Sequence, residues 1–279
     1  NFLYVSNSFT YNYDLKEADV VFLGIPFAST SIGEKSIYAP TIVRECLKLV
    51  EGYSKKFDIN IFKSIRFCDL GNLDVVPGNY EKTAERIRET IKEIKEINSK
   101  ALLIFIGGEH LITLPIIEVL EPKTIVSFDA HIDARKAYMG ERFTHATWAY
   151  HASKISRIYY YGARSFSEEE VENFEIKSLK LGEICKEIER IEDPVYITID
   201  IDVFDPSYVE TGLPTFGDEG KGITIKEFFN VIENIAKSQN VIGIDIVEIS
   251  SDKISSKTGM LAAEIIKHVL GALKYFGKI

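Results

Sequence analysis

Short apolar segments recur along the chain and alternate with segments of helical periodicity. We predict strands where the apolar segments lie, at residues 18–27, 65–71, 101–108, 124–130, 157–164, 195–202 and 241–249. Apolar residues recurring every three or four positions predict helices at residues 41–53, 80–98, 111–120, 224–238 and 256–276. Strands that are apolar on both faces and alternate with helices form a parallel sheet covered on both sides.

This alternation predicts an α/β fold in one domain, spanning residues 1–279. We expect three layers, α/β/α, around a mostly parallel, doubly wound sheet of about eight strands. A closed (β/α)₈ barrel is the alternative, because it uses the same alternation. The sequence contains no linker, repeat or low-complexity segment that would mark a second domain.

Composition and charge exclude several classes of function. The net charge of −9 argues against nucleic acid and anionic membranes as partners and suits a cationic small molecule. Three scattered cysteines do not make a disulfide framework, which favours a reducing, cytoplasmic location. We see neither a signal peptide at the start of the sequence nor an apolar run of the ~20 residues that a membrane span needs.

Acidic and histidine residues gather where predicted strands end. Four clusters do so: "GGEH" (107–110), "DAHID" (129–133), "DID" (200–202) and Glu248 in "DIVEIS". The carboxyl ends of parallel strands meet at one edge of a sheet, so we expect these clusters to converge. Residues two apart on a strand share a face, which predicts common directions within "DAHID" and within "DID".

Aspartates crowded at one sheet edge repel one another, and cations remove the repulsion. Four aspartates (129, 133, 200 and 202) match two divalent ions in charge, with His110 and His131 as neutral ligands. Oxygen and imidazole ligands without thiolate suit Mn²⁺, and shared carboxylates would set two ions ~3.5–4 Å apart around a hydroxide. Taken singly, each aspartate would be a helix cap or turn residue, and His110 a core or loop histidine.

Six segments resemble, in family order, the signature segments of the ureohydrolase superfamily, which contains arginase, agmatinase and related guanidino or amidino hydrolases. They are "GGEH", "SFDAHIDAR", "FTHATWAYHASK", "GARSFSEEE", "ITIDIDVFDP" and "GIDIVEIS", and the resemblance spans residues 18–275. It implies an arginase-like fold and two Mn²⁺ per subunit. By this resemblance one ion is held by His110, Asp129, Asp133 and Asp200, and the other by Asp129, His131, Asp200 and Asp202.

The resemblance also implies catalytic roles. Glu248 matches the glutamate that orients the guanidinium, and His145 matches a loop histidine that shuttles protons and meets the substrate. Asp133 is expected to bond or relay the proton of the nucleophile. Without the resemblance, His145 would be an ordinary surface histidine. The family also implies a homo-oligomer, a trimer or hexamer.

Substrate choice follows from smaller details. Arg135, expected at the substrate, and the "GGEH" form both resemble the agmatinase branch, which cleaves agmatine to putrescine and urea. Arginase, guanidinobutyrase and formiminoglutamase-like activities stay open, as does a non-catalytic, metabolite-binding or regulatory relative.

Three segments that would line the pocket depart from the family pattern: residues 31–40, residues 209–222, and "HAT" (145–147) followed by Trp148. The second of these is acidic. Glu210, Asp218 and Glu219 could attract a second cationic end of the substrate, or they could be an ordinary solvated loop.

Overall fold

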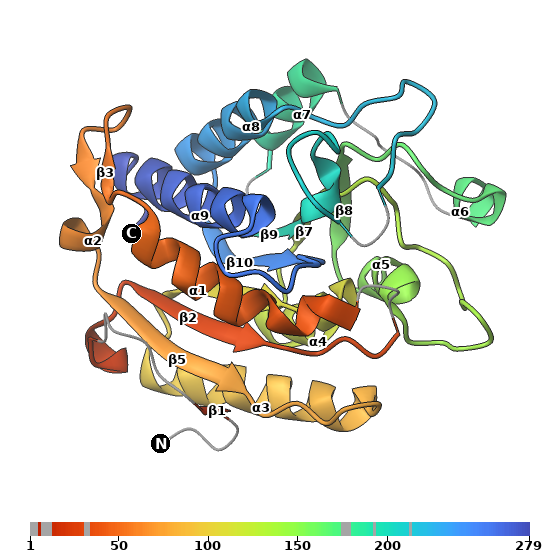
Figure 1. Ribbon diagram of the computed structural model, residues 1–279, viewed down its shortest axis with the longest axis horizontal. Helices are drawn as coiled ribbons and strands as arrows, with labels where there is room; N and C mark the ends of the chain where they lie inside the picture. The colour runs from red at the N-terminus through yellow and green to blue at the C-terminus, as the bar shows by residue number, and fades with distance from the viewer. Residues whose placement is uncertain (1–4, 7–12, 31–33, 174–179, 192–193, 212–213) are drawn as a thin grey trace.

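An eight-stranded sheet runs through the computed structural model, which describes residues 5–6, 13–30, 34–173, 180–191, 194–211 and 214–279. The strand order is β1-β5-β2-β6-β10-β9-β7-β8 (Figure 1). Seven strands are parallel: β2 (Val20–Ile25), β5 (Phe67–Leu73), β6 (Leu102–Gly107), β7 (Thr124–Phe128), β8 (Arg157–Tyr161), β9 (Val195–Asp200) and β10 (Val241–Val247). The short β1 (Val5–Ser6) pairs antiparallel with β5 at one edge. The sheet is open, which excludes the closed barrel and confirms the mostly parallel eight-stranded fold.

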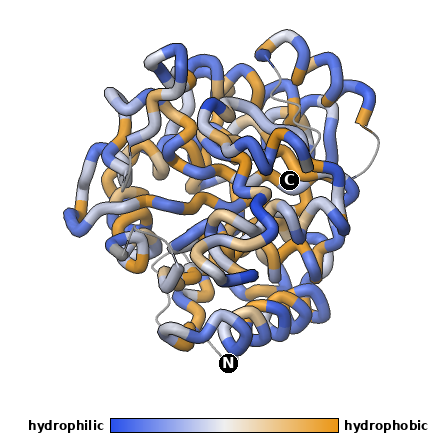
Figure 2. The backbone as a smooth tube through the Cα atoms, turned by 90° about the vertical axis from the view of Figure 1, so that its right-hand side faces the viewer, coloured by the Kyte–Doolittle hydropathy of each residue, from blue (hydrophilic) through white to orange (hydrophobic). Residues whose placement is uncertain are grey.

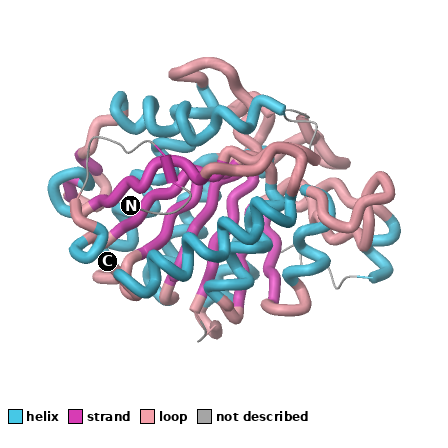
Figure 3. Tube along the Cα trace, turned by 90° about the horizontal axis from the view of Figure 1, so that it is seen from below, coloured by secondary structure: helices cyan, strands magenta, loops and turns pink. Residues whose placement is uncertain are grey.

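Helices cover both faces of the sheet (Figures 1 and 3). On one face α1 (Ala39–Leu49), α8 (Ile225–Ser238) and α9 (Lys257–Tyr275) pack together, with α7 (Leu181–Ile188) against α8. On the other face α3 (Tyr80–Ile97), α4 (Thr113–Leu120) and α5 (Trp148–Ala152) form a second group. The short α2 (Ile61–Ser64) and α6 (Glu168–Asn173) complete the α-helices of the described chain.

Strand β6 shows why the apolar runs form central strands. All six of its residues are buried. Ile104 and Ile106 join the apolar cluster under α1, α8 and α9, whereas Leu103 and Phe105 join the cluster under α3 and α4. Both faces of the strand therefore lose water, and the hydrophobic segments gather inside the molecule (Figure 2).

The helix predicted at residues 41–53 ends earlier, at Leu49. Val50 leaves the helix with an extended backbone, and Tyr53–Ser54 forms strand β3, which pairs with β4 (Ile59–Asn60). The carbonyl of Gly52 accepts a hydrogen bond from the N–H of Ile61. This hairpin competes with a further helical turn, and periodicity alone did not reveal it.

Among the described residues, no helix is both long enough and apolar enough to cross a bilayer. The cysteines Cys46, Cys68 and Cys185 are all free.

His268 of α9 lies in an aromatic site away from the acidic clusters. Its ring stacks on Phe229 with 3.7 Å between centroids and meets Phe57 edge-on at 5.1 Å. Its Nε2 lies 3.0 Å from Oε1 of Glu233, which also pairs with Lys56. Burial, only partly offset by Glu233, lowers the pKa of His268 to about 4.

This buried histidine makes stability pH-dependent. Because the folded-state pKa lies below the ordinary ~6.5, the unfolded chain takes the proton first as pH falls. The stability is therefore complete above about pH 6.5 and is lost towards about pH 4, by at most on the order of 3 kcal/mol. We expect His268→Phe, which keeps the stacking, to lose less unfolding free energy than the parent between these pH values in urea titrations. Equal losses in the two proteins would contradict this.

Candidate metal centre and active site

Side chains from four adjacent strands converge at one edge of the sheet. His110 follows β6, Glu248 follows β10, Asp200 ends β9 and Asp129 follows β7. These strands are neighbours in the order β6-β10-β9-β7. The clusters that are far apart in sequence therefore meet, as the carboxyl-end rule predicts.

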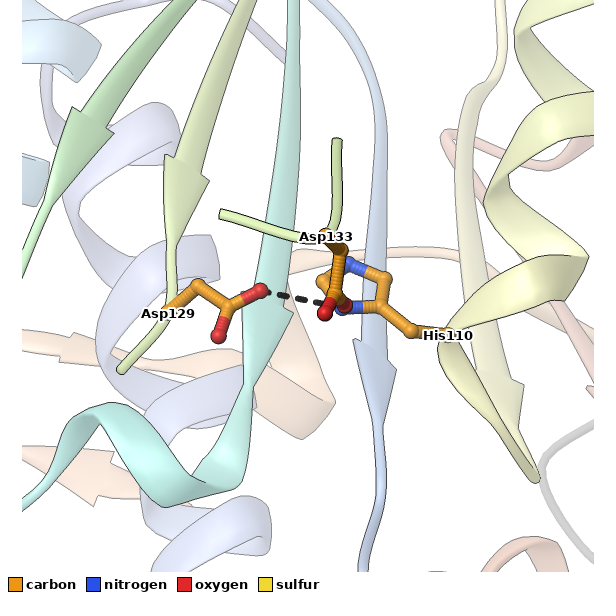
Figure 4. A group of neighbouring side chains, drawn as sticks. All are labelled: His110, Asp129 and Asp133. Atoms are coloured by element: carbon orange, nitrogen blue, oxygen red, sulfur yellow. Dashed lines mark ion pairs between the residues drawn. The ribbon is translucent and has the colours of Figure 1, made fainter. Parts of the chain in front are cut away.

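The first group surrounds His110 (Figure 4). The Nδ1 atom of His110 lies 3.2 Å from Oδ2 of Asp129 and 3.5 Å from Oδ2 of Asp133. It also lies 3.5 Å from Oδ2 of Asp200. These are the four residues that the resemblance assigns to one ion.

The second group surrounds His131. Its Nδ1 lies 2.9 Å from Oδ2 of Asp202 and 3.7 Å from Oδ1 of Asp129. In the set of His110, Asp129 and Asp133, and in that of Asp129, His131 and Asp202, potential ligand atoms all lie within 4.8 Å of one another. The two sets share Asp129, so its carboxylate lies between two adjacent potential cation sites.

Turns after the strands, rather than the alternation of side chains along a strand, bring the side chains of "DAHID" and "DID" together. Strand β7 ends at Phe128 and β9 at Asp200, each two residues before the predicted ends. Beyond them, Oδ1 of Asp129 accepts the N–H of His131 at 2.7 Å, and Oδ1 of Asp200 accepts that of Asp202 at 2.9 Å. The same Asx-type bond therefore aims both motifs, and the expectation that each shares one strand face was wrong.

Two buried atoms of the first group, one nitrogen and one oxygen, are suited to bind a cation. Nδ1 of His110 and Oδ2 of Asp129 are buried, and within the described chain neither makes a hydrogen bond of acceptable geometry. Leaving such an atom unpaired costs about 1–3 kcal/mol. Two lone-pair atoms 3.2 Å apart are satisfied together by a metal ion. Carboxylate and imidazole donors without thiolate suit Mn²⁺ or a similar ion.

Charge at the centre is unbalanced without a cation. Burial and neighbouring aspartates raise the pKa values of Asp133 and Asp200. Burial disfavours the charged form of His131, but its bonds to Asp129 and Asp202 outweigh this and raise its pKa to about 12. The cluster therefore attracts positive charge, and a bound metal would displace protons.

A buried hydroxyl fixes the ring of His110. Its Nε2 lies 2.8 Å from Oγ1 of Thr198, which donates its proton to Oδ1 of Asp245 at 2.6 Å. Thr113 and Tyr196 donate to the other oxygen of Asp245 at 2.8 and 2.7 Å. Because the threonine proton is engaged, Nε2 is the donor and Nδ1 keeps its lone pair for the centre. Thr198 and Asp245 are not among the residues that the sequence motifs indicate, although each is a polar residue inside an apolar strand.

Trp148 is part of the centre, not merely a departure from the family pattern. It is fully buried, and its ring stacks on His110 with 4.5 Å between centroids. Its Nε1 donates to Oδ2 of Asp133 at 3.2 Å. Asp133 has a φ of 54°, a backbone conformation unusual for a residue with a side chain.

Glu248 lies beside His110 and also has a left-handed backbone, with φ 59°. Its Oε1 accepts the N–H of His110 at 3.0 Å. Burial, followed by the charge of Glu109, raises its pKa. Non-glycine residues in this conformation cluster at functional sites, which agrees with the predicted position of Glu248.

His145 and Arg135 meet at Tyr138. The half-buried ring of His145 contacts Tyr138 edge-on at 5.5 Å, and burial lowers the pKa of His145 to about 4. The Arg135 guanidinium lies 5.1 Å from the Tyr138 centroid, and its Nε lies 3.8 Å from Oε2 of Glu170. The contacts of Arg135 are thus with Glu170 and Tyr138, which gives no direct sign of a substrate role.

The segment after β9 folds back onto the centre. Arg164 donates to the carbonyls of Asp202, Val203 and Thr215. Oγ1 of Thr215 then lies 3.3 Å from Nε2 of His131.

The three acidic residues of the segment 209–222, Glu210, Asp218 and Glu219, are all exposed, and the backbone of Glu210 bonds to Thr258. The segment at 31–40 and that at 209–222 lie partly outside the described residues, at 31–33 and 212–213.

Known proteins resemble the chain along nearly all of its length. A model of the arginase family matches residues 18–271. The chain is 35% identical to an agmatinase from Pyrococcus horikoshii, over 92% of this chain and 93% of the relative. It is 33% identical to an N(1)-aminopropylagmatine ureohydrolase from Thermococcus kodakarensis, over 99% of both. The crystal structure of the agmatine ureohydrolase of Thermoplasma volcanium matches with a TM-score of 0.84 and 28% identity, covering 96% of this chain and 94% of that one.

Because both potential cation sites use Asp129, metal binding at either site is expected to depend on it. We expect Asp129→Asn to lose most of the about two divalent ions per chain that a paired site holds, measured by elemental analysis after Mn²⁺ loading and desalting. Asp218→Asn removes the same charge from an exposed position and should keep the parent's metal content. Full metal content in Asp129→Asn would rule out this site.

Thr198 offers a subtler test, because it touches only the far side of His110. Thr198→Val keeps the shape and removes the hydroxyl, so we expect a loss of about 10–100-fold in Mn²⁺ affinity, measured by competition with a chelator. Thr198→Ser restores the hydroxyl and should recover most of the affinity. Unchanged affinity in Thr198→Val would mean that Asp245 does not orient the ligand.

Proposed function

Since the chain belongs to the arginase family, in its agmatinase branch, and is therefore a hydrolase of amidine or guanidino C–N bonds, we propose that it cleaves agmatine to putrescine and urea. The observation that carries this proposal is the pair of His/Asp groups that share Asp129 directly beside Glu248. A non-catalytic relative would not need to keep all of these side chains together.

We assign the metal positions as follows. His110, Asp129, Asp133 and Asp200 would hold one Mn²⁺, and Asp129, His131, Asp200 and Asp202 the other. Two such ions supply Lewis-acid polarisation and a coordinated water that is acidic near neutral pH. The remaining chemistry belongs to the side chains around them.

Glu248 binds and orients the substrate in this proposal. A carboxylate and a guanidinium form a planar, bidentate pair, and the second donor to Glu248, the N–H of His110, fixes its carboxyl plane. Asp133, held by Trp148, accepts the proton of the attacking water. The guanidinium carbon gains an oxygen while its planarity is lost.

His145 completes the reaction by moving a proton. With a pKa of about 4 it is neutral at working pH, so it can accept a proton from one group and deliver it to another. The carbon–nitrogen bond to the alkyl amine breaks as that nitrogen receives the proton. The added oxygen gives up its remaining proton to the leaving amine as the carbonyl bond of urea forms, so urea and the alkylammonium ion are released.

A longer substrate is the second candidate. The relative from Thermococcus kodakarensis is named for N(1)-aminopropylagmatine, and it aligns with 99% of this chain. The added aminopropyl group brings one more ammonium, which suits the exposed carboxylates of Asp218 and Glu219.

The proposal also includes a trimer or hexamer in a reducing cytoplasm, where the three free cysteines would stay reduced.

Urea release decides between these activities. We expect the Mn²⁺-loaded protein to turn over agmatine or N(1)-aminopropylagmatine with a kcat/KM at least about tenfold above arginine, guanidinobutyrate and formiminoglutamate, with formamide followed for the last. Glu248→Gln removes the charge that pairs with the guanidinium and should lower kcat/KM by about 100-fold, the size expected for a charged contact of about 3 kcal/mol. No product from any substrate, with two ions bound, would refute the proposed substrates.

A further inference from the structure

We propose that Glu109 and Thr30 are positioning residues that hold His145 at the active site and fix the tautomer of its ring. The inference rests on the proposed function, because it deepens the role given there to His145. Glu109 and Thr30 are not members of the two His/Asp groups, and in this inference both act through the histidine.

The first link is a buried carboxylate. Glu109 has no exposed surface, and its Oε2 accepts the backbone N–H groups of Ser29 and Thr30 at 2.8 and 2.7 Å. Its Oε1 accepts the hydroxyl proton of Thr30 at 2.9 Å. The end of β6 thus holds the segment that follows β2, its neighbour in the sheet.

The backbone makes this link rigid. Gly108 and Glu109 donate their N–H groups to the carbonyls of Ile25 and Phe27 at 2.9 and 2.8 Å. A Cβ atom at Gly108 would lie only 2.0 Å from the Phe27 carbonyl oxygen, so only glycine permits this approach. The segment after β2 is also held by residue 78, because the hydroxyl of Ser29 accepts the N–H of Gly78 at 3.0 Å. Thr30 therefore has a fixed position from which to act.

The second link joins Thr30 to His145. The N–H of His145 donates to Oγ1 of Thr30 at 2.9 Å, and Nδ1 of the same histidine lies 3.5 Å from that oxygen. Across the ring, Tyr138 contacts His145 edge-on. The backbone of His145 is anchored by a normal hydrogen bond, while the ring contact is long for one.

The direction of the first bond decides the tautomer. A hydroxyl has one proton, and that of Thr30 goes to Glu109. Its oxygen can then only accept, so a protonated Nδ1 is attracted to it across 3.5 Å, whereas an unprotonated Nδ1 would set two lone pairs against each other. The contact therefore favours the Nδ1–H tautomer of His145, which leaves Nε2 as the nitrogen that takes up and returns a proton.

The hydrogen bonds that link Glu109, Thr30 and His145 form a relay. Replacing Glu109 by glutamine would reverse the direction of these bonds without changing the shape of the side chain. The amide oxygen would keep the two backbone N–H groups, and the NH₂ group would donate to Thr30. The threonine proton would then turn towards His145 and favour the opposite tautomer. A residue that only tethered the loop would tolerate this substitution.

The kinetic test uses the Mn²⁺-loaded full chain with the best substrate. We expect Thr30→Val and Glu109→Gln to lower kcat by about 10–100-fold, less than most of the about 10²–10⁴-fold that a proton-transfer group itself contributes, while KM and metal content stay within about twofold. Thr30→Ser should recover most of kcat because it restores the hydroxyl. Thr90→Val is the matched control, since Thr90 lies in α3 and its buried hydroxyl has no hydrogen-bond partner within the described chain.

A double-mutant cycle separates positioning from general damage. In a His145→Gln background, Thr30→Val should lower kcat by less than about twofold, because the imidazole ring through which Thr30 acts is already gone. Equal losses in both backgrounds, or an unchanged kcat in Thr30→Val, would overturn the inference. Full activity of His145→Gln would instead refute the proton role within the proposed function.

A spectroscopic test needs no turnover. In protein labelled with ¹⁵N-histidine, the His145 ring signals, assigned by their absence from His145→Gln, should report Nδ1–H in the parent and Nε2–H in Glu109→Gln. The same tautomer in both proteins would contradict the relay, whatever the kinetics show.

Discussion

Carboxylates crowded and buried at the carboxyl ends of β6, β10, β9 and β7 set the constraint on which the rest of the site depends. Asp129, Asp200 and Asp202 are almost fully buried, and burial together with like charge raises the pKa of Asp200. Groups that repel one another in this way disperse unless something holds them. Two positive ions would remove the repulsion, but the protein must keep the ligands in place before the ions arrive.

Backbone hydrogen bonds provide that restraint. Asp129 and Asp200 each use one oxygen on an N–H two residues further along, and Asp202 uses one on the N–H of Ala130 at 3.0 Å. The last bond ties the two motifs to each other across β7 and β9, which are neighbours in the sheet. One oxygen of each aspartate is thus committed to structure, and the other faces the centre. The sheet sets the distance between the two motifs, and the turns set the direction of their carboxylate oxygens.

The sequence predicted the central strands and their convergence well, because a strand that is apolar on both faces is stable only inside a sheet that helices cover on both sides. It also predicted which six side chains come together, since each follows or ends a strand. It failed where position depends on contacts between distant segments. Thr198, Asp245 and Trp148 are fixed by partners from other elements, and the turns after Phe128 and Asp200 depend on side-chain bonds to the backbone. Periodicity contains neither kind of information, and the short α5, α6 and α7 give too few turns to show it.

The position of Glu109 is hard to explain by packing alone. Its charge raises the pKa of Glu248 and adds to an edge already rich in carboxylates. A glutamine would hold the Ser29 and Thr30 backbone groups equally well and would carry no charge. What glutamine cannot do is accept the proton of Thr30 while its oxygen serves the backbone. A second carboxylate oxygen is needed for that bond, and through it the direction of the hydrogen bonds reaches His145. The unfavourable charge is therefore coupled to the proton chemistry of a different loop, as buried polar networks at functional sites often are.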